Sequence, residues 1–359
     1  GGKVMEKKLK IGIIGTGSIS ESHIHAYRKN PNVEVYAFCD IRKDRLKEMG
    51  EKYGVTRLYT DKDVMLRELP ELDAVSVCTW NSQHAPCTIA ALKAGKHVLC
   101  EKPMATSAKE AEEMKKAAEE SGKLLMVGFV RRFGNDCAIV KDFIDHDYFG
   151  ELYYAKATYL RRNGSPGGWF GDKKMSAGGP LIDLGVHVID LTRYLLGNPK
   201  PVSVYGAVFH KLGDRRELKD KKGYTASSAT GKEEFNVEDL ATAMIRYDNG
   251  AVVSVEASFS LNIKQDEGKI ELFGTKAGAK LDPELELYSQ QNGYMNNVQL
   301  CMPTALSFDG LFEQEINHYI DCLVHGTPCK APAEDGITLM KILDAIYESA
   351  STGHEVVIA

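Results

Sequence analysis

Short apolar runs alternate with helical segments through the first third of this chain, and this pattern restricts the possible folds most strongly. The runs expected to be strands lie at 10–14, 33–39, 73–78, 97–100 and 124–130. Helices are expected at 85–94 and at 107–121, where Ser107 followed by Glu110 forms a capping signal. Strands that alternate with helices form a parallel sheet covered on both faces, which binds ligands at the carboxyl ends of its strands.

After about residue 130, strand-like segments follow one another with few helices between them. These segments lie at 151–162, 201–210, 240–247, 251–260 and 269–273. Asp248-Asn249-Gly250 predicts a tight hairpin, so we expect a largely antiparallel, one-sided sheet. Helices are expected at about 180–196, 312–324 and 334–351.

One segment of the second part, 211–234, is polar and rich in charge. By composition alone it resembles a disordered hairpin tip. A neighbouring subunit, a substrate cleft or packing between molecules could order it.

The charge balance excludes several classes of protein. The chain has 359 residues, 45 basic and 50 acidic side chains, and a formal net charge of −5. Nucleic-acid binders usually carry a basic excess, so we expect no nucleic-acid partner. No run approaches the roughly 20 consecutive apolar residues of a membrane span, so we expect no membrane association.

The cysteines and the N-terminal residues favour a cytoplasmic location. None of the eight cysteines forms a Cys-x-x-Cys pair, and Cys39, Cys78, Cys100 and Cys137 lie in or beside apolar runs. We interpret them as reduced thiols rather than a disulfide framework. Residues 1–10 are polar and basic, without the apolar region of a signal peptide.

A glycine-rich turn follows the first expected strand and opens a helix. Gly15 allows the tight turn, and Gly17 lets the backbone approach a pyrophosphate at the helix N-terminus. The third position of this fingerprint is usually glycine or alanine and is Ser20 here. The pattern alone is weak and could be a plain turn, but its order of strand, turn and helix favours a dinucleotide site.

Asp40 ends the second expected strand, where a carboxylate can accept hydrogen bonds from the adenosine ribose and repel a 2′-phosphate. A solvated carboxylate at a strand end is the alternative. NAD is therefore favoured over NADP, although Arg42, Lys43 and Arg45 could offset the repulsion.

Two further segments carry candidate chemistry. Lys102 lies between a strand end and Pro103, where an ammonium could stabilise charge on a substrate oxygen, or could be an ordinary surface lysine. Asp183 and His187 are four residues apart in an otherwise apolar helix, so they share one face. They are either a buried pair that holds the core or a site whose imidazole acts as a general base.

These motifs together resemble the Gfo/Idh/MocA family of oxidoreductases. The resemblance rests on Gly15-x-Gly17, Glu101-Lys102-Pro103, Gly178-Gly179-Pro180-Leu181-Ile182-Asp183-x-Gly185-x-His187-x-x-Asp190 and Thr79-Trp80-Asn81-Ser82-Gln83-His84. Trp80 departs from the family's proline. Val237-Glu238-Asp239 and Asn249-Gly250 resemble the family's second domain.

The resemblance implies a fold and two domains. A Rossmann dinucleotide-binding domain is expected over 1–130. An α/β substrate-binding domain with a large, mostly antiparallel open sheet is expected over 131–359, and its C-terminal helices can pack back on the first domain. The open sheet would build a homodimer or homotetramer.

The resemblance also implies roles for individual residues. The expected catalytic residues are Lys102, Asp183 and His187. The expected cofactor-binding residues are Gly15, Gly17, Ser18, Ile19, Asp40, Thr79, Asn81, His84, Glu101 and Lys102. Lys102, Asp183 and His187 are also expected to bind the substrate, and the chemistry of Arg132 and Trp169 makes these two further expected substrate-binding residues.

The substrate is expected to be a sugar, a polyol such as an inositol, or a glycoside. Trp169 could stack on a sugar ring or serve as a core aromatic. An arginine such as Arg132 could bind an anionic group. His23 and His25 lack a third ligand at suitable spacing, so no metal is expected.

The predicted activity is an NAD(P)-dependent dehydrogenase that oxidises a secondary hydroxyl. Two alternatives stay open: an enzyme that cleaves glycosides by transient oxidation and elimination, and a non-catalytic dinucleotide sensor.

Overall fold

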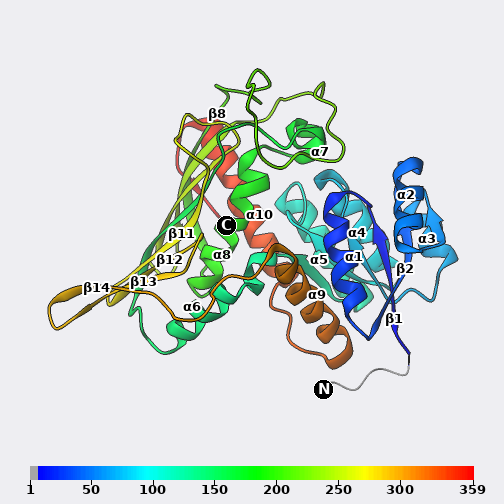
Figure 1. The fold of residues 1–359 in the computed structure, drawn as a ribbon, viewed down its shortest axis with the longest axis horizontal. Helices are drawn as coiled ribbons and strands as arrows, with labels where there is room; N and C mark the ends of the chain where they lie inside the picture. The colour runs from blue at the N-terminus through cyan, green and yellow to red at the C-terminus, as the bar shows by residue number, and fades with distance from the viewer. Residues whose placement is uncertain (1–6) are drawn as a thin grey trace. The chain divides into compact units, whose positions relative to one another are not determined.

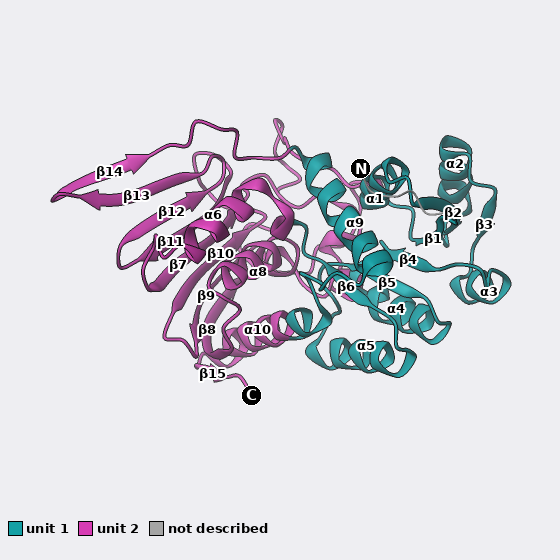
Figure 2. Cartoon of the chain, turned by 90° about the horizontal axis from the view of Figure 1, so that it is seen from below, with its two compact units in different colours: residues 1–130, 307–337 teal, residues 131–306, 338–359 magenta. Residues whose placement is uncertain are grey.

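The computed structural model describes residues 7–359, so most of the polar N-terminal segment discussed above lies outside the described residues. The chain divides into two compact units (Figure 2). Unit 1 comprises the chain up to Val130 together with Ser307–Ile337, and unit 2 comprises Arg131–Leu306 and Thr338–Ala359. Within the described residues, no helix combines the length and apolarity needed to cross a membrane.

Unit 1 contains a six-stranded parallel sheet in the order β3-β2-β1-β4-β5-β6. Its strands are β1 (Leu9–Ile14), β2 (Val33–Cys39), β3 (Arg57–Tyr59), β4 (Ala74–Val77), β5 (His97–Glu101) and β6 (Leu125–Gly128). This strand order is that of a Rossmann fold, which confirms the predicted class. The four expected core cysteines are confirmed as buried free thiols. The order reverses between β1 and β4, where such sheets bind their ligands.

The helices of unit 1 cover this sheet (Figure 1). They are α1 (Ser18–Lys29), α2 (Lys43–Tyr53), α3 (Lys62–Glu68), α4 (His84–Lys93), α5 (Ala108–Ser121) and α9 (Phe308–His325). The Ser107 hydroxyl accepts from the Glu110 N–H at 3.2 Å, as the capping signal predicts. Helix α9, from the C-terminal part of the chain, packs along α1, where Asn30 Nδ2 donates to Asn317 Oδ1 at 2.9 Å.

Unit 2 contains a nine-stranded sheet in the order β14-β13-β12-β11-β7-β10-β9-β8-β15. Its strands are β7 (Leu152–Leu160), β8 (Pro201–Phe209), β9 (Leu240–Tyr247), β10 (Val252–Ser258), β11 (Glu267–Gly274), β12 (Ala277–Leu281), β13 (Glu286–Gln291), β14 (Tyr294–Val298) and β15 (Val356–Val357). Neighbours β7 and β10 run parallel, and the remaining neighbours in this described sheet run antiparallel. The predicted mostly antiparallel sheet is confirmed.

The two faces of this sheet differ. Along β9, Ala241, Ala243 and Ile245 are buried while Met244 and Arg246 are exposed, which is the alternation of a half-covered strand. The helix α8 (Val186–Leu195) packs on β7, β10 and β11. The remaining helices of unit 2 are α6 (Asn135–Asp145), the short α7 (Lys173–Ser176) and most of α10 (Ala333–Thr352).

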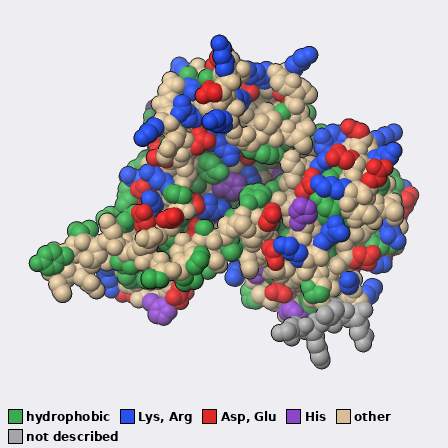
Figure 3. All heavy atoms as spheres, in the orientation of Figure 1, with side chains coloured by type: hydrophobic (Ala, Val, Ile, Leu, Met, Phe, Trp, Pro, Cys, Tyr) green, Lys and Arg blue, Asp and Glu red, His purple; other side chains and the backbone are tan. Residues whose placement is uncertain are grey.

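The polar segment 211–234 is held by carboxylates of the same unit. Asp239 accepts the backbone N–H groups of Lys211, Leu212 and Gly213 at 2.6–2.8 Å. Asp214 accepts from both the N–H and the hydroxyl of Ser165 at 2.7 Å. Figure 3 shows Lys and Arg side chains gathered over this upper part of unit 2. Bonds within the chain therefore order the segment.

Candidate active site

The turn between β1 and α1 requires glycine at its first position. Gly15 has a φ of +89°, and a Cβ on it would lie 2.7 Å from the Cys78 carbonyl. A Cβ on Gly17 would meet no atom within 4 Å, so this backbone faces open space. The Ser20 hydroxyl donates to the Gly17 carbonyl at 2.6 Å, which explains how serine is accommodated at the third position. With Ser18 and Ile19 opening α1, the turn forms a cradle that fits a pyrophosphate.

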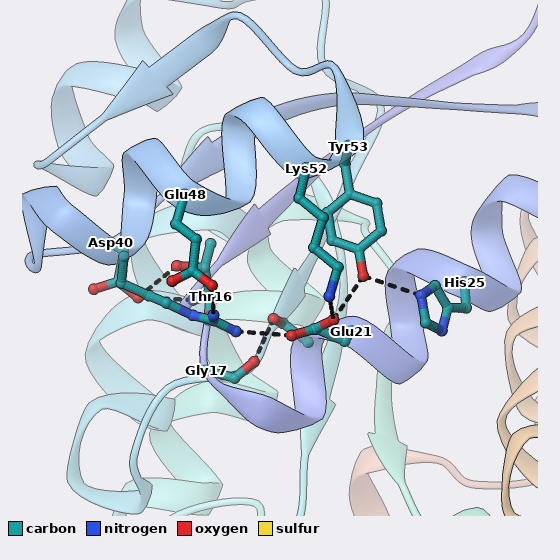
Figure 4. Close-up of polar contacts among 10 residues, drawn as sticks. Thr16, Gly17, Glu21, His25, Asp40, Glu48, Lys52 and Tyr53 are labelled. Atoms are coloured by element: carbon teal, nitrogen blue, oxygen red, sulfur yellow. Dashed lines mark hydrogen bonds and ion pairs between the residues drawn. The ribbon is translucent and has the colours of Figure 1, made fainter. Parts of the chain in front are cut away.

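Asp40, directly after β2, supports this turn (Figure 4). Its Oδ2 accepts from both the N–H and the hydroxyl of Thr16 at 2.8 Å, and its Oδ1 accepts from the Arg42 N–H at 2.8 Å. The Asp40 side chain thus lies at the carboxyl edge of the sheet beside the glycine turn, as predicted. Arg42 lies next to it, with 3.6 Å between its Nε and Asp40 Oδ1.

A second carboxylate ties α1 to α2. Glu21 accepts from Arg45, Lys52 and Tyr53 at 2.5–2.9 Å (Figure 4). Burial opposes the charge of Glu21, but these donors lower its pKa to about 2. Arg45 Nε also donates to the Thr16 carbonyl at 2.8 Å, so the network fixes the turn from outside.

The segments after β4 and β5 meet through His84. Its Nδ1 lies 2.6 Å from the Pro103 carbonyl and its Nε2 lies 3.0 Å from the Thr79 carbonyl. Burial lowers the pKa of His84, which favours the neutral ring. His84 is 1% exposed, so it positions Thr79 and the Lys102-Pro103 turn from beneath.

Glu101 lies in a buried polar cluster below Lys102. His23 Nε2 is 2.7 Å from Glu101 Oε1, and His23 Nδ1 is 3.0 Å from the Ser76 hydroxyl. Burial would raise the pKa of Glu101, but His23, Lys102 and His84 lower it overall. Residue Glu101 is therefore an ionised core carboxylate, and Lys102 follows it half-buried at the strand end.

Glu315 of α9 completes this cluster, and no sequence motif pointed to it. It is fully buried, and neither of its carboxyl oxygens has a hydrogen-bond partner among the described residues. Burial and the charge of Glu101 raise the pKa of Glu315 well above its usual range. The charge of Glu101 and the burial of both groups therefore favour the protonated form of Glu315.

In unit 2, Asp183 and His187 lie where a wide helical turn becomes regular. Residues Leu181–Gly185 form a π-helical turn, in which the Val186 N–H bonds to the Leu181 carbonyl, and α8 follows. The predicted single helix therefore has two parts. Both Asp183 and His187 are half-buried. A π turn of this kind is frequent at functional sites.

Glu238 clamps the start of this helix. Its carboxyl oxygens accept from the Gly179 N–H at 3.0 Å, the Leu181 N–H at 3.2 Å and the Tyr347 hydroxyl at 2.8 Å. Side chains at 178 and 179 would exclude this arrangement, because a Cβ on Gly178 would lie 2.1 Å from Tyr347 Oη. Burial raises the pKa of Glu238 despite these donors. Glu238 is therefore a positioning residue. In the sequence it stood out only as part of Val237-Glu238-Asp239, which resembles the family's second domain.

Arg132 requires a correction. It was expected to bind substrate, but its side chain is fully buried and its guanidinium donates two hydrogen bonds to the Asp190 carboxylate, at 3.0 and 2.7 Å. The Tyr194 ring packs 4.5 Å from the guanidinium. Because buried charges require partners, the pair serves the core of unit 2.

A cavity of about 510 Å³ in unit 2 lies beside the helix that carries His187. Its lining includes Val188 together with Tyr159 and Arg161 from the end of β7. Burial opposes the charge of Arg161, but nearby Tyr159, Asp183 and Asp266 raise its pKa overall. The ordered segment contributes Lys221–Thr225, so it forms one wall of the cavity.

Trp169 lies in a short 3₁₀ turn, Gly168–Gly171, and is half-buried. Its indole stacks on the ring of Phe170 with 4.1 Å between centroids. One face of the indole is therefore covered by a neighbour, and its role toward a sugar stays a prediction.

Two family models match the chain. One, described as an oxidoreductase family with an NAD-binding Rossmann fold, matches residues 9–129. The other, described as the C-terminal α/β domain of the oxidoreductase family, matches residues 141–358.

Curated relatives and solved structures agree with these matches. A D-glucoside 3-dehydrogenase of Escherichia coli K12 is 34% identical over 352 residues, covering 97% of each chain. A myo-inositol 2-dehydrogenase of Thermotoga maritima is 28% identical over 331 residues, covering 91% of this chain and 92% of the other. A structure of levoglucosan dehydrogenase in complex with NADH superimposes with a TM-score of 0.86 at 24% identity, over 98% of this chain and 100% of that one.

Proposed function

The chain belongs to the Gfo/Idh/MocA family of oxidoreductases, and on this premise we propose that it is an NAD(H)-dependent dehydrogenase of a ring hydroxyl in a glycoside, sugar or polyol. The observation that carries the proposal is the Asp183–His187 pair on a clamped helix whose Val188 lines a substrate-sized cavity. The names of the relatives, which act on glucosides and inositols, support the substrate class.

The residues of unit 1 fit a dinucleotide. Gly15, Gly17, Ser18 and Ile19 would hold the pyrophosphate, and Asp40 would accept hydrogen bonds from the adenosine ribose. Beside Asp40, the side chain of Ile41 is 67% exposed, which suits contact with a flat adenine ring. Thr79, Asn81, Glu101 and Lys102 follow the strand ends where the nicotinamide would lie. We favour NAD over NADP because of Asp40.

The proposed chemistry needs one residue from unit 1 and two from unit 2. When bound, NAD⁺ supplies the acceptor for the hydride of the carbinol carbon. His187 removes the hydroxyl proton as general base, and the Lys102 ammonium stabilises the negative charge that develops on the oxygen. Asp183 binds the substrate or orients the imidazole.

The cavity of unit 2 is the proposed substrate site. Its volume of about 510 Å³ lies within the range of about 300–1,000 Å³ that is usual for small-molecule sites. Tyr159 offers a ring face, and Arg161 offers hydrogen-bond donors to sugar hydroxyls.

The open face of the nine-stranded sheet is the proposed subunit interface. Tyr205 and Met244 pair across β8 and β9 and are 53% and 46% exposed, and Phe209 lies on the same face. Exposed apolar residues grouped in this way mark interaction surfaces. Sedimentation velocity should show a dimer or tetramer, and Tyr205→Lys together with Met244→Lys should reduce its size.

A substrate panel tests the function. Free sugars, inositols and D-glucosides should be screened with NAD⁺ and with NADP⁺ while nicotinamide absorbance is recorded. We expect NADH formation with at least one glycoside or polyol, and faster reaction with NAD⁺. Absence of turnover with every substrate, although NADH binds, would favour the sensor. Release of free sugar without net NADH would favour glycoside cleavage.

His187→Ala tests the assigned base. Loss of general-base catalysis should lower kcat by about 10²–10⁴-fold while NADH affinity is kept. His210→Ala, at an exposed histidine of unit 2, is the matched control and should retain wild-type turnover. Unchanged kcat in the His187 variant would remove this residue from the mechanism.

A further inference from the structure

Three side chains typical of a thiophilic metal site gather at the end of α9, in unit 1. The ligand atoms of His318, Cys322 and Cys329 all lie within 4.8 Å of one another. His318 and Cys322 are one helical turn apart on α9, and Cys329 lies in the segment after Gly326, the residue that ends the helix. Neither the glycine turn nor the proposed catalytic residues include any of the three.

The spacing suits a tetrahedral ion. His318 Nε2 lies 3.5 Å from Cys322 Sγ. A tetrahedral Zn²⁺ with bonds of about 2.3 Å to sulfur and about 2.0 Å to nitrogen separates these two ligand atoms by about 3.5 Å. The Cys322 and Cys329 thiols are in hydrogen-bonding contact, so the second sulfur lies beside the first.

The segment that carries Cys329 is anchored to the Rossmann sheet. The Val127 N–H of β6 donates to the Ala331 carbonyl at 2.9 Å, and Met126 forms a bridge with Pro332. Cys329 is thus held between α9 and an edge strand. Ligands on rigid elements keep the geometry that a metal site needs.

The imidazole is already in the form that binds a metal. The Lys330 N–H donates to His318 Nε2 at 3.0 Å, so this nitrogen carries the lone pair. A cation would take this lone pair in place of the Lys330 contact.

A buried hydroxyl adjoins the two thiols. Tyr319 is fully buried, and its hydroxyl has no hydrogen-bond partner among the described residues. Its hydroxyl lies near the thiols of Cys322 and Cys329. A water on a metal ion would offer this hydroxyl a partner.

We propose that His318, Cys322 and Cys329 bind Zn²⁺ through one imidazole nitrogen and two thiolates, with water at the fourth position. Binding forms one Zn–N and two Zn–S bonds and releases two thiol protons to solvent, with no change of oxidation state. The ion would pin the segment between α9 and α10 to the end of α9.

The test uses the full-length chain, kept reduced with a phosphine, stripped with a chelator and titrated with Zn²⁺ or Co²⁺. We expect one ion per chain by elemental analysis and a thiolate-to-cobalt absorption band. Cys322→Ser, Cys329→Ser and His318→Asn should each weaken binding at least tenfold, and both serine variants should diminish the band. Cys301→Ser and His325→Asn change an exposed thiol and an exposed histidine outside the cluster, and should bind as the wild type does.

The proposal fails if the reduced wild-type chain takes up no stoichiometric metal, or if the cluster variants bind as tightly as the controls. It also fails if a Cys322–Cys329 disulfide forms in air while the reduced chain binds no ion. Thermal unfolding with Zn²⁺ supplies a second readout, since only chains with the intact cluster should gain stability. None of these measurements depends on dehydrogenase activity.

Discussion

The buried carboxyl groups of the two units are satisfied in different ways. In unit 2, the Asp190 carboxylate accepts two hydrogen bonds from the Arg132 guanidinium. Glu238 and Asp239 each accept three hydrogen bonds. In unit 1, Glu101 is paired with His23, while the oxygens of Glu315 have no hydrogen-bond partner within the described part of the chain.

This difference separates two uses of buried acids. The acids of unit 2 organise backbone: Glu238 fixes the start of the helix with Asp183, and Asp239 fixes the segment that lines the cavity. In unit 1 Asp40 organises backbone in the same way, but the Glu101–Glu315 pair differs, because the charge of Glu101 favours the protonated form of Glu315. We therefore expect the acids of unit 2 to act mainly by fixing backbone, and the Glu101–Glu315 pair of unit 1 to give the larger dependence of stability on pH.

The largest expected effect tests the pairing in unit 2. Arg132→Met should destabilise the fold by about 3–5 kcal/mol, because it removes the guanidinium that forms two hydrogen bonds to the buried Asp190 carboxylate. Urea unfolding measures this loss. The double variant Arg132→Met/Asp190→Leu should recover most of the stability, since it removes both charges. A loss below about 1 kcal/mol in the single variant would show that Asp190 does not depend on the pair.

The helix clamp should have the next largest effect. Glu238→Ala leaves two backbone donors and the Tyr347 hydroxyl without their acceptor, and the expected total loss is about 1–3 kcal/mol, because water can enter the vacated space and pair most of these donors. Turnover should fall as well, because Asp183 and His187 lose their fixed helix start. Tyr347→Phe is the milder control, because it removes one hydrogen bond worth about 0.5–1.5 kcal/mol. Equal kcat in Glu238→Ala and wild type would contradict the positioning role.

A more local effect is expected at Asp239. Asp239→Ala removes the acceptor of three consecutive N–H groups, so segment 211–234 should exchange amide hydrogens faster and become sensitive to protease. KM should rise more than kcat falls, because Lys221–Thr225 line the cavity. Asp248→Ala, at the tip of the β9–β10 hairpin, is a control that should leave the segment protected. Unchanged exchange in Asp239→Ala would show that other contacts order it.

The smallest effect concerns the unpaired acid of unit 1. The folded-state pKa of Glu315 is raised, so between its ordinary value and the raised one the unfolded chain has lost this proton and the folded chain keeps it. Stability should therefore fall as the pH rises through this window, and Glu315→Gln should remove that fall.

Thermal unfolding at about pH 5 and at about pH 8 measures how stability depends on pH. Glu315→Gln should gain a few degrees over wild type at the higher pH and less at the lower. Glu313→Gln, on the same helix in a solvent-accessible ion pair with Lys29, should leave the pH dependence unchanged. If the melting temperatures of Glu315→Gln and wild type changed with pH in the same way, Glu315 would not be the source of a pH-dependent stability in unit 1.

Local patterns predicted much of the fold. Strands β2 and β9 have the bounds that their apolar run and their alternation predict. Strands β13 and β14 were not predicted, because they carry few apolar residues and their alternation is weak. Figure 3 shows the apolar tip of this hairpin at the left, where Tyr294 and Met295 are 75% and 81% exposed.

Some residues of the candidate site could likewise be predicted from local patterns, and others could not. Gly15, Asp40 and Lys102 could be assigned because each follows a predicted strand, and the carboxyl ends of parallel strands meet at one edge. Glu315 could not be assigned, because its environment comes from α1 and β5, more than 200 residues earlier in the chain. Arg132 was misassigned because its partner, Asp190, is identified by packing rather than by spacing.

The sequence by itself determined the strand and helix periods, the glycine turn and the spacing of Asp183 and His187, since these depend on neighbours a few residues away. Tertiary structure alone decided which acids are ionised, which arginine forms a buried ion pair, and which thiols lie close to an imidazole. The physical reason is that the charge state and the partners of a buried polar group depend on groups distant in the chain. Folding brings these groups together and removes water from them.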